Sequence, residues 1–249
     1  MPRVTVARVG VDVVDREALD ASIRNFVSEG RQAVLAYANI HAVNIAWEDR
    51  GFADFLGKAA IVYCDGEGVR LGARLLGRRL PPRVVLTYWI WDLCVLCERE
   101  DYSMFFLGSG EEAVRLAIDE IRRRHPALRI AGYHHGYFAK HGPENEEVLE
   151  KIRAARPELL FVGFGMPAQE LWIAENAGRI GANVILPCGS MIDYVSGRKR
   201  AAPPWMADHG MEWLFRLMQE PARLWRRYLV GNLLFFWRVI CQRARGGGA

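Results

Sequence analysis

Cysteine is scarce in this sequence. The chain has five cysteines among 249 residues, and an odd, scattered set of this kind does not form a disulfide framework. Cys94 and Cys97 make a single C-x-x-C motif inside a stretch with a helical pattern, and no second pair completes a zinc site. We therefore expect both to be buried small hydrophobic residues, in a protein of a reducing compartment.

Long apolar segments are also missing. Residues 1–10 lack the apolar core of a signal peptide. The longest apolar stretch, 228–240, is interrupted by Asn232 and Arg238, so it is too short and too polar to span a bilayer. The expected location is the cytoplasm.

The chain as a whole has only a small net charge, whereas its C-terminal end is strongly positive. The formal net charge is +4, from 33 Lys and Arg against 29 Asp and Glu. Residues 211–249 hold seven arginines and two acids, so this tail is +5 and residues 1–210 are −1. Such asymmetry predicts an anionic partner for the tail. The composition, 51% hydrophobic and 25% charged, excludes a disordered or collagen-like chain.

Short apolar runs alternate with helical patterns along most of the chain. The expected strands are 4–9, 33–38, 60–64, 104–107, 128–132, 159–163 and 183–187. The expected helices are 16–28, 41–49, 69–76, 91–100, 111–124, 145–155 and 168–180. Several strands are almost continuously apolar, which is typical of strands buried on both faces. The alternation predicts an α/β fold, a Rossmann-like and mostly parallel sheet with helices on both faces.

The pattern changes at a basic segment that contains prolines, 198–204, after which only helices are expected. We therefore predict an α/β nucleotide-sugar-binding catalytic domain, 1–197, and a helical appendage, 198–249. Asp208 is a candidate cap for a helix that runs to Gln219, and Pro221 starts another that reaches about Arg243.

The second of these helices combines arginines with exposed-looking aromatic and aliphatic residues. Arg223, Arg226 and Arg227 fall at i, i+3 and i+4, on one face. Trp225, Leu229, Leu233 and Phe236 form a neighbouring apolar stripe. This composition favours a helix at a membrane surface, although packing against its own domain or against a second subunit is an alternative.

Glycines follow several of the predicted strands, where ligands of open parallel sheets bind. Gly108 and Gly110, and Gly163 and Gly165, each fit a loose G-x-G-x-x-A pattern, and glycine turns let the backbone approach a phosphate. Dinucleotide binding also requires an acidic residue at the end of the next strand, and neither candidate has one. The sequence therefore favours nucleotide binding in general over NAD binding.

Asp65 follows a predicted apolar strand and precedes a glycine. A carboxylate in this position is a candidate general base, and the alternative is a helix N-cap. No Asp-x-Asp pair is present for a metal that bridges a nucleotide, so we expect neither metal nor cofactor. A departing diphosphate would then need arginines, from the tail or from Arg83.

Several motifs together resemble the WecG/TagA/CpsF glycosyltransferases over residues 9–234. The motifs are Asn39, Asp65-Gly66, G-F-G-M-P-A-Q-E at 163–170, R-A-A-P-P-W at 200–205, M-E-W-L-F-R at 211–216 and E-P-A-R at 220–223. The resemblance implies an inverting, metal-independent enzyme of cell-surface polysaccharide synthesis. It would transfer N-acetylmannosamine, or a related hexose or uronic acid, from a UDP-sugar to a polyprenyl-diphosphate-linked sugar. It also implies a C-terminal appendage that docks on the inner face of the cell membrane and closes the active site.

The resemblance also implies roles for individual residues. Asp65 is similar to the family's base, and the expected catalytic set is Asp65, Arg83, Arg216, Arg223 and Arg227. The expected substrate-binding set is Tyr37, Asn39, Gly66, Gly108, Gly110, Tyr137, Gly165, Gln169, Glu170, Gly189 and Asp193. Tyr37, where the family commonly has Thr, and the aromatic segment 86–93 depart from the family pattern and bear on the choice of sugar.

Three hypotheses remain at this point. The first is a membrane-associated glycosyltransferase with Asp65 as base. The second is a non-enzymatic binder of anionic lipid or nucleic acid, in which nucleic acid is disfavoured because the body is slightly negative and has no RNA-binding motif. The third is a nucleotide-dependent oxidoreductase, against which the missing ribose carboxylate argues.

Overall fold

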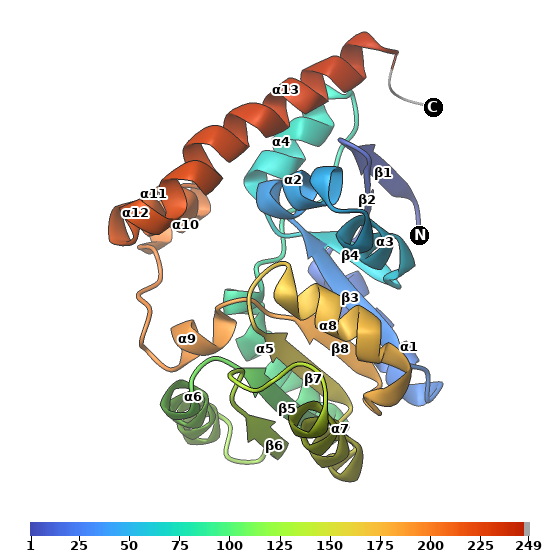
Figure 1. Ribbon diagram of the computed structural model, residues 1–249, viewed down its shortest axis with the longest axis vertical. Helices are drawn as coiled ribbons and strands as arrows, with labels where there is room; N and C mark the ends of the chain where they lie inside the picture. Colours follow the sequence, from blue (N-terminus) through green and yellow to red (C-terminus); the bar gives the residue numbers. More distant parts are fainter. Residues whose placement is uncertain (247–249) are drawn as a thin grey trace. The chain divides into compact units, whose positions relative to one another are not determined.

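The computed structural model describes residues 1–246, except for the side chain of Asp208. The chain forms two compact units, each built from separate segments. Unit 1 consists of Met1–Asp15, Tyr37–Val84 and the chain from Arg200 onward. Unit 2 consists of Arg16–Ala36 and Val85–Lys199. Figure 1 labels the helices and strands.

The main sheet has six strands in the order β4-β3-β8-β7-β5-β6. They are β3 (Ala33–Ala38), β4 (Ile61–Cys64), β5 (Ser103–Gly108), β6 (Arg129–His134), β7 (Leu159–Gly163) and β8 (Val184–Pro187). The pairs β3–β8, β8–β7, β7–β5 and β5–β6 are parallel. The predicted α/β fold with a mostly parallel sheet is confirmed.

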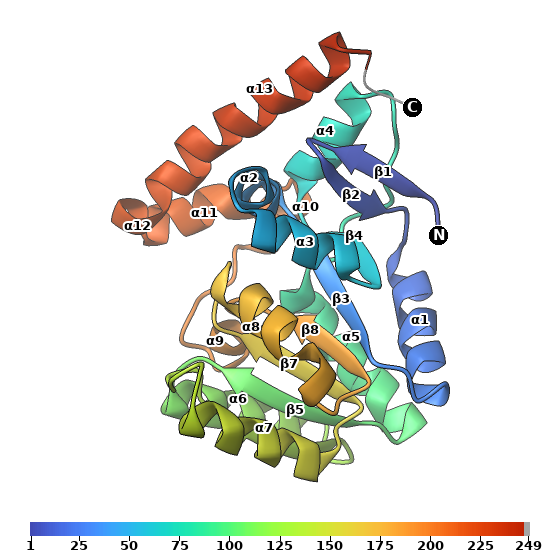
Figure 2. The same cartoon turned by 45° about the vertical axis from the view of Figure 1, so that its right-hand side comes forward.

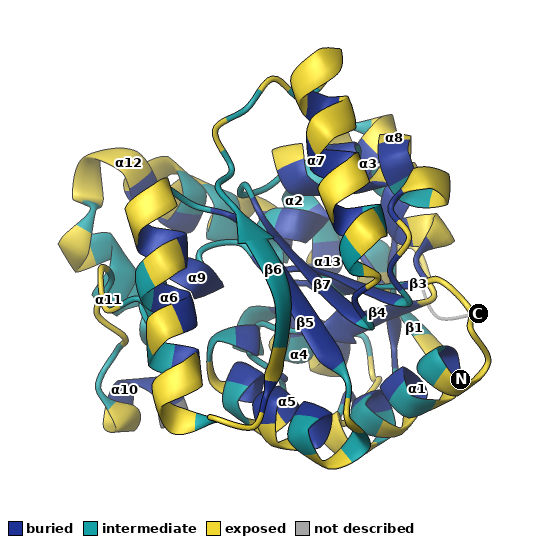
Figure 3. Ribbon diagram, turned by 90° about the horizontal axis from the view of Figure 1, so that it is seen from below, coloured by how far each residue is buried: buried dark blue, intermediate teal, exposed yellow. Residues whose placement is uncertain are grey.

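Helices cover both faces of the sheet in unit 2. They are α1 (Arg16–Ser28), α5 (Leu86–Glu100), α6 (Glu111–Arg124), α7 (Pro143–Ala155), α8 (Ala168–Asn176), a 3-10 turn (Ala177–Arg179) and α9 (Met191–Val195). The chain moves one way along the sheet through α6 and the other way through α7 and α8. Because such crossovers are right-handed, α6 lies on one face and α7 and α8 on the other, as Figures 2 and 3 show.

The centre of unit 2 is apolar because β5 and β7 are buried along their whole length. Phe106 and Phe161 stack across these two strands with ring centroids 5.0 Å apart. In Figure 3 these strands are dark blue, whereas the edge strand β6 is mostly of intermediate exposure. The continuous apolar runs in the sequence correspond to this doubly covered position.

Unit 1 contains a separate hairpin at its N-terminal end. Instead of one strand over 4–9, the chain forms β1 (Arg3–Val6) and β2 (Val9–Asp12), which pair antiparallel in a sheet of their own. The expectation of a single strand was wrong because Ala7 and Arg8 adopt positive φ and make a two-residue turn, as tight hairpins require. Asp12 binds Arg3 and also accepts the Val62 amide at 2.7 Å, which ties the hairpin to β4.

The remaining elements of unit 1 are helical. They are α2 (Ile40–Glu48), α3 (Arg50–Lys58), α4 (Glu67–Leu75), α10 (Pro204–Asp208), α11 (Glu212–Gln219), α12 (Pro221–Trp225), a π-helical turn (Arg226–Val230) and α13 (Gly231–Ala244). Asp208 ends α10, and α11 begins after Met211, so the expected Asp208 cap was wrong. Pro203 and Pro204 start a short helix before Asp208, so this residue stands at the end of a helix rather than at the start of one.

The last helix packs tightly on the rest of unit 1. A side chain on Gly72 of α4 would bring its Cβ within 2.7 Å of the Phe235 ring of α13, so glycine permits the close approach. Arg238 donates to Asn44 at 2.7 Å and to Glu48 at 2.9 Å on α2. Gln242 bonds the backbone of the hairpin turn. Within residues 1–246, none of the helices combines the length and the apolar character that crossing a bilayer requires.

Candidate active site

Asn39 and Asp65 form the centre of the candidate site in unit 1. Asn39 follows β3 and caps α2, where its Oδ1 accepts the Ala42 amide at 3.0 Å. This bond orients the side chain so that its Nδ2 donates to Asp65 Oδ2 at 3.1 Å. Gly66 belongs to the same arrangement, because a Cβ there would lie 3.1 Å from the Cβ of Asn39. The structure thus brings together three of the predicted substrate-site or catalytic residues.

The surroundings of Asp65 raise the pKa of its carboxyl group. Burial in the surrounding protein is the main cause that raises its pKa above the ordinary aspartate value, and the charge of Glu212 adds to it. The Asn39 hydrogen bond and the charges of Arg83 and Arg216 act in the opposite direction. A carboxylate with a raised pKa is a better proton acceptor than an exposed one.

Arginines from the C-terminal helices reach the same neighbourhood. Arg227, in the π-helical turn, feels the charges of Arg216 and Asp65 and the hydroxyl of Tyr37. Burial lowers its pKa, and its Nε is buried without a hydrogen-bond partner. A buried, unpartnered guanidinium nitrogen is costly unless it serves a ligand. Arg216 and Arg227 therefore lie within the electrostatic influence of Asp65, and their predicted contact with a diphosphate stays a prediction.

Two other predicted arginines of unit 1 are engaged in ion pairs with glutamates. Arg83 forms an ion pair with Glu212 of α11 and donates to the Ala207 carbonyl at 2.6 Å. Arg223 is exposed and pairs with Glu220. Arg83 thus ties the C-terminal helices to the strand end, while none of the described contacts of Arg223 reaches Asp65. Their predicted roles towards substrate stay predictions.

His41 is a member of this cluster that the sequence did not single out. Burial, and then the charges of Arg227 and Arg216, lower its pKa to about 4. The imidazole is therefore neutral near pH 7 and can donate or accept a hydrogen bond without adding charge. Its place two residues after Asn39, at the start of α2, is the one signal that pointed to it.

In unit 2 the glycines follow the strands as the sequence predicted. A Cβ on Gly108, at the end of β5, would lie 2.5 Å from the Gly163 carbonyl oxygen at the end of β7. Gly165 has φ of +84° and Gly189 has φ of +55°, conformations that favour glycine. Gly110 precedes α6, and among the described residues no side chain forms a cap hydrogen bond at the start of this helix. Such turns are suited to hold a phosphate.

Gln169 and Glu170 are buried rather than displayed. Gln169 is 0% exposed and its Oε1 accepts the amides of Gly165 at 3.2 Å and Gly189 at 3.0 Å. Its Nε2 donates to Glu170 Oε1 at 2.7 Å, and burial raises the pKa of Glu170 to about 7. The second oxygen of Glu170 has no hydrogen-bond partner. In this structure both side chains hold the turns after β7 and β8, and contact with substrate stays a prediction.

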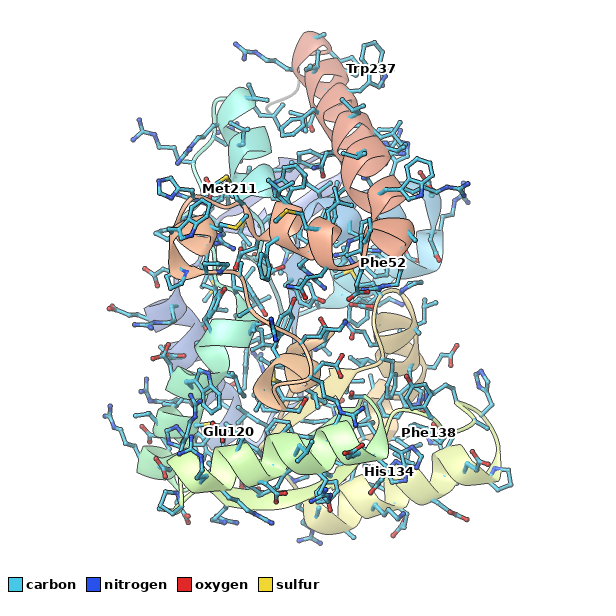
Figure 4. The ribbon with its side chains drawn as sticks, turned by 90° about the vertical axis from the view of Figure 1, so that its left-hand side faces the viewer. Phe52, Glu120, His134, Phe138, Met211 and Trp237 are labelled. Carbon is cyan, nitrogen blue, oxygen red and sulfur yellow. The ribbon has the colours of Figure 1, made fainter. Side chains whose placement is uncertain are left out.

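The other predicted residues of unit 2 lie around the same strand ends. Asp193 of α9 accepts a hydrogen bond from Ser109 and pairs with Lys199 at 3.7 Å. Tyr137 is 81% exposed in the loop after β6. His134 is the last residue of β6 rather than a loop residue, and it packs edge to face with Phe138 of that loop (Figure 4).

Cys94, Cys97 and Trp89 are parts of the core, whereas Tyr88 of the same segment is 41% exposed. Cys94 and Cys97 are fully buried, and burial raises the pKa of the Cys94 thiol to about 12. The interpretation of both as small hydrophobic residues is confirmed. Trp89 is 2% exposed and donates to Asp20 at 2.9 Å, so this aromatic fills core. Within residues 1–246, no three His, Cys, Asp or Glu side chains gather as a metal-binding group.

Comparison with known proteins shows which protein family this chain matches. Residues 4–248 match the glycosyl transferase family described as WecG/TagA/CpsF. The chain belongs to this family. The predicted family and the predicted enzyme class, a glycosyltransferase, are both confirmed.

Relatives of the chain share a common name. A protein of Bacillus spizizenii is 28% identical over 219 residues, covering 85% of this chain and 83% of its own. One of Bacillus subtilis is 28% identical over 211 residues, covering 85% and 80%. One of Staphylococcus aureus is 27% identical over 189 residues, covering 76% and 73%. All three are named N-acetylglucosaminyldiphosphoundecaprenol N-acetyl-beta-D-mannosaminyltransferase.

Proposed function

We propose that this protein transfers N-acetylmannosamine, or a related hexose or uronic acid, from a UDP-sugar to a sugar carried on a polyprenyl diphosphate. The names of the relatives support the lipid-linked acceptor and the N-acetylmannosaminyl group. Membership of a glycosyl transferase family favours this function over the oxidoreductase and the non-enzymatic binder.

The observation that carries the proposal is the half-buried Asp65 carboxylate beside Asn39, with a raised pKa and two arginines nearby. Asp65 accepts the proton of the acceptor hydroxyl while that oxygen attacks the anomeric carbon. The bond from the anomeric carbon to the UDP oxygen breaks in the same step, and UDP leaves with the bonding electrons. A single displacement of this kind inverts the anomeric configuration.

In this scheme, arginine side chains stabilise the negative charge of a diphosphate. Arg216 and Arg227 are fixed cations near Asp65, and guanidinium groups bind diphosphates through paired hydrogen bonds. We assign them to a diphosphate, so that the reaction proceeds without a metal ion. Within unit 2, the glycine turns after β5, β7 and β8 are suited to bind a phosphate.

The C-terminal helices are assigned to the membrane surface, at the inner face of the cell membrane. Large apolar side chains of this segment are exposed: Trp205, Trp213, Met218, Trp225, Leu229, Val230, Leu233, Leu234, Trp237 and Ile240. Trp237 points outward from α13 in Figure 4. Basic residues beside aromatic and aliphatic ones are typical of interfacial helices, and a contiguous apolar surface marks an interaction site. In this scheme residues 198–249 are the docking appendage of a catalytic body, 1–197.

The test is the substitution Asp65→Asn, compared with Asp54→Asn, which removes an exposed acid of α3. We expect Asp65→Asn to lower kcat by about 10²–10⁴-fold without changing the melting temperature, because the amide keeps the shape and can accept from Asn39. Donor sugars are screened with a short-chain lipid-diphosphate acceptor, and products are identified by mass spectrometry. Near-wild-type turnover of the Asp65→Asn variant would contradict the assignment of the base.

A further inference from the structure

A basic cavity lies in unit 1, at the end of α4. Its volume is about 670 Å³, and it is lined by Arg70, Arg74, Gly77, Arg78, Arg79 and Leu80. The lining residues carry four positive charges and no negative one. Asp65, Asn39 and Arg216 are not among them, so the cavity is distinct from the candidate active site.

The local fold explains why these arginines converge. Arg70 and Arg74 are four residues apart on α4 and so lie on one face of the helix, and Arg78 and Arg79 directly follow the turn that ends it. Gly77 has φ of +73°, and the turn is closed by the bonds Gly77 N to Arg74 O and Arg78 N to Ala73 O, both 2.9 Å. These bonds fix the backbone at the helix end, so all four arginines start from a defined stretch of backbone around one cavity.

A structural role accounts for only part of this cluster. Cations at a helix C-terminus are stabilised by the helix dipole, and Glu67 binds Arg70 at 2.6 Å and approaches Arg74 at 3.9 Å. The Nε of Arg70, however, is buried and has no hydrogen-bond partner. Four like charges around one cavity also repel one another. The unpaired Nε donor of Arg70 and the mutual repulsion of the four arginines both indicate an anionic ligand.

We propose that this cavity, which we call the α4 pocket, binds a phosphate group. Guanidinium forks match phosphate oxygens in paired, charge-assisted hydrogen bonds, and several arginines around one cavity favour an anion with several oxygens over a single carboxylate. The phosphate comes either from an anionic phospholipid headgroup or from a soluble phosphate compound. The first source suits the neighbourhood, because α4 packs on α13 through Gly72 and Phe235, and α13 exposes Leu233 and Trp237.

The test uses the full chain with Arg74, Arg78 and Arg79 all replaced by Gln. Arg70 is kept because it pairs with Glu67. The control replaces Arg50, Arg99 and Arg122, three exposed arginines elsewhere, and so changes the net charge equally. A further variant, Arg216→Gln with Arg227→Gln, reports binding at the candidate active site. Melting temperatures verify that all variants fold.

Two probes identify the source of the phosphate. Inorganic pyrophosphate is titrated by calorimetry, and binding to phosphatidylcholine vesicles with and without phosphatidylglycerol is measured by flotation. We expect the α4-pocket variant to lose at least about tenfold in affinity for one probe or both, while the control variant binds as the wild type does. A loss confined to the vesicles identifies a lipid headgroup, and a loss confined to pyrophosphate identifies a soluble compound.

Three results would overturn the proposal. The first is unchanged affinity of the α4-pocket variant for both probes. The second is an equal loss in the control variant, since net charge alone would then explain the binding. The third is that all binding disappears in the Arg216 and Arg227 variant, which would assign the phosphate to the candidate active site. Glycosyl transfer is not measured here, so failure of the α4 pocket and failure of the proposed function are separate outcomes.

Discussion

Asp65 in unit 1 and Glu170 in unit 2 are both acids near the ends of parallel strands, and burial raises the pKa of both. Their surroundings differ. Asp65 is half-buried and lies near Arg216, Arg227 and His41. Glu170 is 1% exposed, is bonded to Gln169 and faces no described arginine. Burial thus raises the pKa of both acids in different surroundings: the proposed base of unit 1 lies among cations, and the acid of unit 2 supports the residue that holds the backbone turns.

Among the variants that test the difference between the two acids, Arg227→Gln is expected to lower turnover most after Asp65→Asn. We expect kcat to fall by about 10²-fold, because a charged donor to the diphosphate is lost, with little change in the melting temperature. Arg226→Gln, at the exposed neighbouring position, is the control and should keep its activity. If both variants lost activity equally, the cluster around Asp65 would not be the functional part of unit 1.

Gln169→Ala tests the supporting role of the second cluster. Two backbone amides, of Gly165 and Gly189, would lose their acceptor, so we expect a loss of about 2–4 kcal/mol in the free energy of unfolding. Gln32→Ala removes one bond of an exposed glutamine to the Ala182 carbonyl and should cost less than about 1 kcal/mol. Denaturant unfolding measures both. A Gln169→Ala protein as stable as the wild type, yet inactive, would instead favour direct contact with substrate.

Glu170→Gln tests the second cluster through an effect on stability that depends on pH and vanishes near pH 4. The pKa of Glu170 is raised to about 7 in the folded protein, from about 4.5 in the unfolded chain. The folded state therefore holds a proton that the unfolded state releases, and wild-type stability falls as pH rises from about 4.5 through 7. We expect the Gln variant to be more stable than the wild type by about 3 kcal/mol at pH 8 and equal to it near pH 4.

The control for this titration is Glu175→Gln, an exposed acid on the same helix. It should leave the dependence of the unfolding free energy on pH unchanged. A Glu170→Gln protein that lost stability at every pH would show that the negative charge, rather than the shape of the side chain, holds the turn.

The fold was largely predictable because buried parallel strands leave a clear signal. Ala33–Ala38 and Leu159–Gly163 were predicted with their observed bounds, since continuous apolar runs between helical patterns are typical of strands covered on both faces. The hairpin Arg3–Asp12 was missed because its turn contains Ala7 and Arg8 rather than glycine or asparagine. Turns of that kind give no compositional signal.

The candidate site was predictable where a side chain follows directly from a strand end, as with Asn39 and Asp65. The roles of Gln169 and Arg83 were not, because a sequence motif does not show whether a polar residue faces a ligand or bonds the protein's own backbone. His41 was missed because its surroundings come from residues far away in the chain, Arg216 and Arg227.

The π-helical turn at Arg226–Val230 has a further consequence for the final helix. A π turn holds more residues per turn than an α-helix, so the segments before and after it are rotated relative to an uninterrupted helix. The sequence spacing placed Arg223, Arg226 and Arg227 on one face, whereas Arg227 alone of the three has a buried guanidinium nitrogen. The π turn therefore changes the direction in which side chains before and after it face. Arg227 in the turn lies within the electrostatic influence of Asp65, and Phe235 in the following helix packs on Gly72 of α4.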